Sequence, residues 1–429
     1  MAVRLAAFLT IPLALALTDC SRPAPSTPTP IPQPTPALVP ATPPPPYVPS
    51  KRLETGKLFN GFQYKVTLET EHGSTASIER EIPSSYAAEL QVKVKVPKPN
   101  KDLAEITRLN DKLPVVLPDL AQLVDTATIS PAYDDLYRLK VASLQQNLNR
   151  LDNLLTRHNF FDCETILDLQ HPKTKRRAVF IQSDMDTDTD GSDSDRVPEI
   201  DGSSSTFQPF TSYKWPKKSA TPNAFLAPRE SRLKALEQEL AANNTTAARS
   251  KELKENQARL KGEISDLKKY SYLVAAVDPF VVLPASMVGK KNPFSPVVGD
   301  YCVVIYDHLL YPSVIGDIGP NYKTGEGSLR LCRQLSPRAD MNNRPVNDLK
   351  VTYLVFPGSG DKPWDAPNLD KWRTRCEQLL NDLGGYQGEL FVWEDLTKPK
   401  PVSPPAPVNP AAPGNGTSTS TPAAAPAPP

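Results

Sequence analysis

Short apolar runs, each about as long as a β-strand and bounded by turn residues, recur between residues 166 and 396 of this chain. Runs of this length indicate strands more than long helices. The region closes with a helical pattern over Leu369 to Leu383, which Gly384 and Gly385 end. We therefore expect an α+β domain, mainly β, built as a compact barrel, with the double-psi barrel as one candidate form. The expected strands are Val179–Ile181, Val277–Leu283, Cys302–Tyr306, Ser313–Ile315, Leu329–Leu331 and Val351–Phe356.

A leucine pattern interrupts this region between residues 229 and 269. Apolar residues recur at steps of three, four and seven on both sides of a polar break at Asn243 and Asn244, with charged residues between them. The pattern predicts an antiparallel helical hairpin inserted into the domain. A solvated insertion is favoured over a partner-binding arm, because insertions are commonly tolerated on surface loops.

Residues 51–165 precede the domain and form a separate pattern. Phe62–Leu68 and Leu90–Val96 alternate apolar and polar residues, which predicts two half-buried strands. Leucines from Ala132 to His158 recur at helical spacing. We expect a small module of strands and one helix, with no catalytic residues of its own.

The two ends of the chain differ in composition from its middle. Arg4 and the apolar run Leu5–Leu17 resemble a secretory signal within residues 1–20. Cys20 resembles a bacterial lipidation site, but Asp19 departs from the usual Gly or Ala, so lipid attachment and simple cleavage both stay open. We expect an exported protein, either secreted, periplasmic or anchored to a membrane as a lipoprotein.

Proline dominates residues 21–50, and Pro, Ala, Ser and Thr dominate residues 397–429. The first segment predicts an extended linker and the second a disordered tail. Lys and Arg number 49 against 48 Asp and Glu, so net charge gives no reason to expect nucleic-acid binding. We expect a monomer.

Four cysteines follow Cys20 at wide spacing, without a CxxC pair. One or two disulfides and buried free thiols are both open interpretations. Metal binding is not expected of them, because neither their spacing nor the four histidines form a ligand cluster. The cysteines are Cys163, Cys302, Cys332 and Cys376.

Two carboxylates beside glycine stand nine positions apart, at Asp317 in Gly316-Asp317 and at Glu326 in Gly325-Glu326. A strand ending in an acid, a short loop and a second acid can place two carboxyl groups on one rim. Hydrolysis of a sugar linkage needs such a pair, one acid to protonate the leaving oxygen and one base to activate water. Acids next to glycine are also ordinary turn residues, so the pair alone does not decide.

An acidic run from Asp184 to Asp195 is the second unusual motif. Asp186, Asp188 and Asp190 match the first half of an EF-hand loop, but Val197 stands where the bidentate Glu should be. A looser calcium loop, a carboxylate face for a cationic ligand and a solvated acidic loop remain as alternatives. Two aromatic residues that follow, Tyr213 and Trp215, are candidates for stacking on sugar rings.

Several motifs in order resemble glycoside hydrolase family 75, the inverting endo-chitosanases that cleave β-1,4-linked glucosamine. The resemblance covers about residues 175 to 390 and excludes the N-terminal module. Its motifs are Ala178-Val-Phe-Ile-Gln-Ser-Asp184-Met-Asp186-Thr-Asp188-Thr-Asp190-Gly191, Asp278-Pro-Phe-Val-Val-Leu-Pro284, Gly316-Asp317, Gly325-Glu-Gly-Ser-Leu329 and Val351-Thr-Tyr-Leu-Val-Phe356-Pro-Gly358.

The resemblance implies a catalytic pair, with Glu326 as general acid and Asp317 as the base that activates water. It also implies substrate binding by an acidic cleft, for which chitosan's ammonium groups give a reason. The loop between the two acids is shorter than in fungal members. No cofactor is expected. The candidate substrate-binding residues are Asp184, Asp186, Asp188, Tyr213, Trp215 and Lys323.

Two other functions fit the same residues. The signal and Pro-rich linker would suit a hydrolase of peptidoglycan glycans, whose sugars are N-acetylated. The fold could also serve a non-catalytic envelope protein that binds partners, because a fold does not guarantee activity. Retention of both Asp317 and Glu326 argues against the second alternative.

Overall fold

The computed structural model describes residues 70, 72–86, 92–148, 150, 160–242, 246–341 and 345–398. The expected signal, Cys20, the Pro-rich linker, the strand Phe62–Leu68 and almost all of the tail lie outside these residues. None of the helices described is long and apolar enough to span a membrane.

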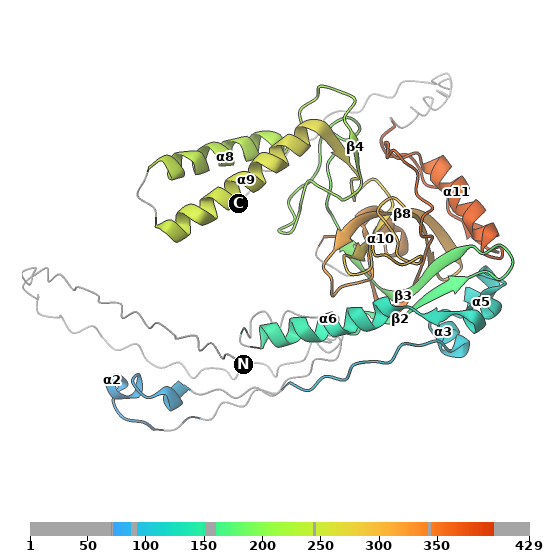
Figure 1. The fold of residues 1–429 in the computed structure, drawn as a ribbon, viewed down its shortest axis with the longest axis horizontal. Helices are drawn as coiled ribbons and strands as arrows, with labels where there is room; N and C mark the ends of the chain where they lie inside the picture. Colours follow the sequence, from blue (N-terminus) through green and yellow to red (C-terminus); the bar gives the residue numbers. More distant parts are fainter. Residues whose placement is uncertain are drawn as a thin grey trace, which may run out of the picture. The chain divides into compact units, whose positions relative to one another are not determined.

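Six strands close into a barrel, because β9 pairs with β3 as well as with β6. Two of the six pairings are parallel, β3 with β9 and β6 with β8, and the other four are antiparallel. The predicted α+β, mainly β fold with a barrel core is therefore confirmed (Figure 1). In order around the ring, the strands are β3 (Arg177–Asp188), β10 (Val346–Val355), β7 (Tyr301–Tyr306), β8 (Leu309–Gly319), β6 (Phe280–Pro284) and β9 (Glu326–Ser328).

Two of the barrel strands, β6 and β7, are almost continuously apolar because both of their faces are buried. Successive side chains of a strand point to opposite faces. In β7, Val303 and Ile305 accordingly join one hydrophobic cluster, whereas Cys302 and Val304 join the other. Strands buried on both faces have no need for polar alternation.

Helices upstream of the barrel share its core. Leu113 and Leu120 lie in the same cluster as Phe180 of β3. β2 (Cys163–Gln170) pairs with β3 and carries the two-residue β1 (Thr128–Ile129) on its other edge. The upstream helices are α2 (Ala76–Glu79), the short 3₁₀ helix η1 (Pro83–Tyr86), α3 (Leu103–Leu109), α4 (Leu113–Val116), α5 (Leu120–Thr126) and α6 (Pro131–Asn147).

Two expected strands are wrong. Residues 92–96 are not in a strand, although Val92 and Val94 pack on the core, so the alternation reflects one-sided burial without a pairing neighbour. Leu329–Leu331 begins helix α10 (Leu329–Leu335), because the Ser328 hydroxyl accepts from Leu331 N–H and caps it. A three-residue apolar run cannot distinguish a strand from a buried helical turn.

The predicted hairpin is confirmed as α8 (Leu226–Ala241) and α9 (Ala247–Lys269), joined by a small cluster that contains Leu236, Leu253 and Leu260. Its base is a two-stranded sheet of β4 (Lys214–Pro216) and β5 (Tyr270–Tyr272). The predicted closing helix is α11 (Leu369–Asp382), and β11 (Glu389–Leu390) then pairs with β8.

The expected long helix at Ala132–His158 is α6, which ends at Asn147; residues 151–159 lie outside the described part. Cys163, Cys302, Cys332 and Cys376 are all buried free thiols, so the disulfide alternative is wrong for these four. Their burial identifies them as small core residues.

Candidate active site

The barrel brings Asp317 and Glu326 to opposite sides of one strand. Val282 of β6 pairs with Asp317 of β8 on one edge and with Glu326 of β9 on the other. Two strand spacings put the backbones of the two acids roughly 9–10 Å apart. The structure thus places the two predicted catalytic residues on either side of Val282.

Asp317 is half-buried, and one of its carboxylate oxygens accepts three hydrogen bonds. Its Oδ1 accepts from the backbone N–H of Ser212 at 2.9 Å, from the Ser212 hydroxyl at 2.6 Å and from the N–H of Ile318 at 2.7 Å. Burial raises the pKa of Asp317, and these hydrogen bonds oppose the rise. The donors fix the carboxylate and favour its ionised form.

Glu326 begins β9 and is also half-buried. Burial raises its pKa, the charge of Lys323 opposes the rise, and the like charges of Asp186 and Asp317 add to it. A Cβ built on Gly319 would lie 3.4 Å from Glu326 Oε2, so the carboxyl group is directed toward the end of β8. The Glu326 carboxyl group therefore faces the strand that carries Asp317.

A glycine sets the backbone immediately before Glu326. Gly325 has φ +74°, and a Cβ there would lie 2.5 Å from the carbonyl oxygen of Asp184. Its own carbonyl oxygen accepts from the N–H of Asp186 at 2.7 Å. Only glycine combines this positive φ with such a close approach. The Gly-Glu motif thus joins the acid-bearing loop to β3.

The acidic run follows β3 into the same site. Asp186 pairs with Glu326 across β3 and β9, and its Oδ2 lies 2.9 Å from Lys323 Nζ. Burial raises the pKa of Asp188 well above its ordinary value, and Glu326, Asp190 and Asp317 add to the rise. Burial also raises the pKa of Asp190, to about 7. These carboxyl groups interact electrostatically with Asp317 and Glu326.

The predicted sugar-stacking role of two aromatic residues does not fit the structure. Trp215 is 1% exposed and Tyr213 is 6% exposed. The Tyr213 ring stacks on Trp364, with centroids 5.2 Å apart. Two of the predicted substrate-binding carboxyl groups, Asp184 and Asp188, are likewise buried. Sequence proximity to the acids did not distinguish rings that support the site from rings that a ligand can reach.

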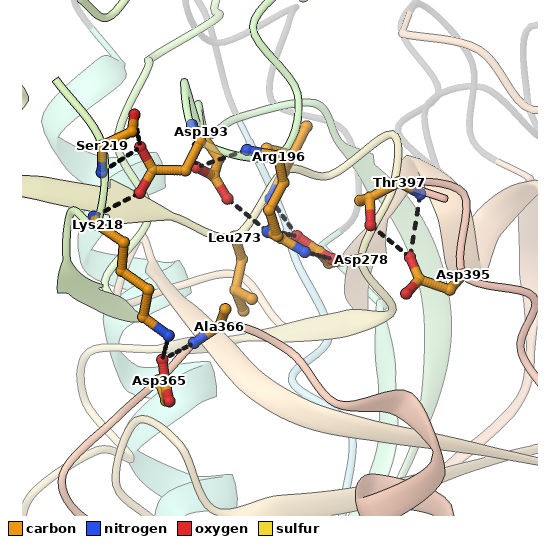
Figure 2. A network of polar contacts seen from close by, with 12 residues as sticks. Asp193, Arg196, Lys218, Ser219, Leu273, Asp278, Asp365, Ala366, Asp395 and Thr397 are labelled. Atoms are coloured by element: carbon orange, nitrogen blue, oxygen red, sulfur yellow. Dashed lines mark hydrogen bonds and ion pairs between the residues drawn. The ribbon is translucent and has the colours of Figure 1, made fainter. Parts of the chain in front are cut away.

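The second half of the acidic run forms a buried ion network, which Figure 2 shows. Arg196 lies between Asp193 and Asp278, at 2.5 Å and 2.8 Å, and both carboxylates are almost fully buried. Its guanidinium group is 5.1 Å from the centroid of the Trp215 ring. The network fixes the loop that follows Asp190 against the strand region before β6.

The three carboxylates of the calcium alternative make contacts within the protein. Asp186 is paired with Lys323, Asp188 Oδ1 accepts from the N–H of Asp190, and Asp190 Oδ1 accepts from that of Gln208. Across the described residues, no group of three or more His, Cys, Asp or Glu is arranged to hold a metal ion.

Sequence reasoning missed Ser212, whose two donors hold Asp317, and Arg196, which holds the acidic loop. Neither residue has a local signal. Ser212 is an ordinary serine in a polar stretch, and Arg196 acquires its role only when Asp278, far along the chain, folds against it.

Two carboxyl groups in one site are the arrangement that hydrolysis of a glycosidic bond requires. Residues 185–385 match the family described as fungal chitosanase of glycosyl hydrolase group 75. The chain therefore carries a domain of this chitosanase family, and the match includes both Asp317 and Glu326. No curated protein matches the chain significantly.

Proposed function

We propose that the protein is an exported endo-chitosanase that hydrolyses β-1,4-linked glucosamine polymers with inversion at the anomeric carbon. The observation that carries the proposal is the pairing of Val282 with both Asp317 and Glu326. It gives the chitosanase-family domain two carboxyl groups across a single strand.

The proposed division of roles follows from the contacts of each acid. Asp317 accepts three hydrogen bonds on one oxygen, which stabilise the anion that a general base must be. Burial raises the pKa of Glu326, and the charges of Asp186 and Asp317 add to the rise. That environment favours a protonated group, which a general acid needs near neutral pH.

The separation between the backbones of the two acids leaves room for an inverting mechanism. Inverting glycosidases need about 6.5–9.5 Å between carboxyl groups to admit a water molecule, whereas retaining enzymes need about 5–5.5 Å. Side chains on strands two spacings apart start from backbones roughly 9–10 Å apart. In the proposed step, Asp317 takes a proton from a water molecule while the water oxygen bonds to the anomeric carbon. The glycosidic C–O bond breaks at the same time, and Glu326 gives its proton to the departing sugar oxygen.

The charge of the site supports a cationic substrate. Asp186, Asp188 and Asp190 gather beside the two catalytic acids, as their mutual effects on pKa values indicate. Glucosamine polymers carry ammonium groups, and a bound ammonium group would favour the ionised form of carboxyl groups whose pKa values are raised. A neutral N-acetylated glycan gains nothing from these charges, so chitosan is proposed over peptidoglycan.

The test is reducing-end release by the purified chain from chitosan and from an N-acetylated glycan, beside Glu326→Gln and Asp317→Asn. Release from chitosan that both variants lose supports the proposal, and an α-configured first product by proton NMR supports inversion. Release only from the acetylated glycan would overturn the substrate, and a β-configured product would overturn inversion. A folded but inactive parent would favour a binding protein.

A further inference from the structure

A buried ion pair upstream of the matched family region contacts the loop that bears Glu326. Lys140 of α6 and Asp162, just before β2, are 4% and 0% exposed, and Lys140 Nζ lies 2.6 Å from Asp162 Oδ2. Buried charges are costly unless they are paired and hydrogen-bonded. Neither residue lies in residues 185–385, which match the chitosanase family.

Asp162 makes hydrogen bonds to two segments next to Glu326. Its Oδ2 also accepts from the N–H of Thr324 at 3.3 Å, two residues before Glu326. Its backbone oxygen accepts from the N–H of Asp184 at 3.1 Å, on the strand that carries the acidic run. One residue thus contacts both the loop that leads into Glu326 and β3, the strand that pairs with Glu326.

The same loop is attached to β3 through Gly325 and Lys323, which both contact Asp186, and to the segment after β6 through the Asn321 carbonyl oxygen, which accepts from the Ser286 hydroxyl. Asp162 adds an anchor from β2, and Lys140 holds that anchor in place from α6. Helix α6 contacts β2 and is drawn beside it in Figure 1. The chain of contacts therefore runs from α6 to Asp162, to Thr324 and to Glu326.

We propose that Lys140 and Asp162 are positioning residues for Glu326, so that the catalytic unit of this enzyme includes helix α6. The kinetic part of its test rests on the proposed function. Without Lys140, Asp162 would be a buried carboxylate without that cation and would move or take up a proton. Thr324 and the loop would then lose a fixed acceptor, and Glu326 would be displaced from the glycosidic oxygen.

The test compares full-length Lys140→Met with Arg176→Met. The control removes another ion pair, Arg176 with Asp382, which is partly exposed and joins the start of β3 to the end of α11. In Lys140→Met we expect kcat per folded molecule on a glucosamine oligomer to fall about 10²-fold, as a displacement near 1 Å can cause. KM should change little, and Arg176→Met should keep the parental kcat.

Rescue separates positioning from a general loss of packing. The double variant Lys140→Met with Asp162→Asn removes both charges and keeps an acceptor for Thr324, so it should recover kcat relative to Lys140→Met alone. If Lys140→Met does not fold, Lys140→Arg and the double variant replace it. A folded Lys140→Met with parental kcat would overturn the proposal.

Amide hydrogen exchange of residues 323–326 gives a readout that needs no substrate. Exchange there should rise in Lys140→Met and not in Arg176→Met. If the parent is inactive on chitosan while exchange still rises, the loop anchor is supported and the proposed function fails. Unchanged exchange in a folded Lys140→Met would overturn the anchor itself.

Discussion

Asp317 and Glu326 are pairing partners of the same residue, Val282, on opposite edges of β6. The relationship depends on barrel closure, because β9 reaches β6 on one side and β3 on the other. Closure also brings Asp186 into register with Glu326. Three adjacent strand pairings, β8 with β6, β6 with β9 and β9 with β3, therefore bring the two acids and the acidic run together.

The two acids should respond differently to the leaving group. Glu326→Gln and Asp317→Asn should each lower kcat on chitosan by about 10²–10⁴-fold. An aryl glycoside with an acidic phenol leaves without protonation, so Glu326→Gln should recover most activity on it. Asp317→Asn should not, because attack of water still needs the base. Equal losses on both substrates would contradict the assigned roles.

Removal of Lys323 should move the alkaline limb of the kcat–pH profile to higher pH. Glu326 must be protonated to act, and the charge of Lys323 lowers its pKa. In Lys323→Met the Glu326 pKa rises, and Asp186, deprived of this partner, adds to the rise. Lys350→Met removes an exposed lysine paired with Asp348 and serves as the control. A shift of the limb to lower pH would contradict the electrostatic model.

The two candidate acids could be singled out from the sequence, but the geometry between them could not. Asp317 and Glu326 stand out because each follows glycine at the edge of an apolar run. Their common neighbour Val282 could not be predicted, since strand register depends on closure of the whole ring. The β-rich domain itself was predictable because strands buried on both faces leave continuous apolar runs of strand length.

The predictions that the structure contradicts failed because burial and long-range contacts cannot be read from the local sequence. Trp215 gives the same signal in sequence whether it stacks on a sugar or lies under Arg196, and only the fold decides between them. Leu329–Leu331 was misassigned because the serine that caps α10 looks like an ordinary loop residue. The Lys140–Asp162 pair joins segments that no local pattern connects.

Asp188→Asn should stabilise the protein increasingly as pH rises. The folded-state pKa of Asp188 is raised well above its ordinary value, so the parent loses stability between that value and the raised one. Each pKa unit removed corresponds to about 1.4 kcal/mol. Asparagine keeps an oxygen for the N–H of Asp190. Melting temperatures of parent and variant should agree near pH 4 and diverge by pH 8, with Asp111→Asn, at a side chain that is 79% exposed, as the control.

Arg196→Met should destabilise the protein by about 3–5 kcal/mol, because it leaves Asp193 and Asp278 buried without their cation. Arg138→Met removes an exposed pair with Asp135 and should cost about 0–1 kcal/mol. Urea unfolding at neutral pH measures both. A small effect at Arg196 would mean that the acidic loop is held by other contacts.

Gly325→Ala should lower activity more than Gly358→Ala does. Both glycines have positive φ, +74° and +71°, so alanine carries similar backbone strain at each. At Gly325 the new Cβ would also lie 2.5 Å from oxygen atoms of Asp184, whereas nothing lies within 4 Å at Gly358. The loop before Glu326 must then move, and kcat per folded molecule should fall by roughly tenfold or more. Steady-state kinetics on a glucosamine oligomer, with unfolding curves for both variants, separates displacement of Glu326 from loss of stability. Equal kcat values in the two variants would show that the acid tolerates the shift.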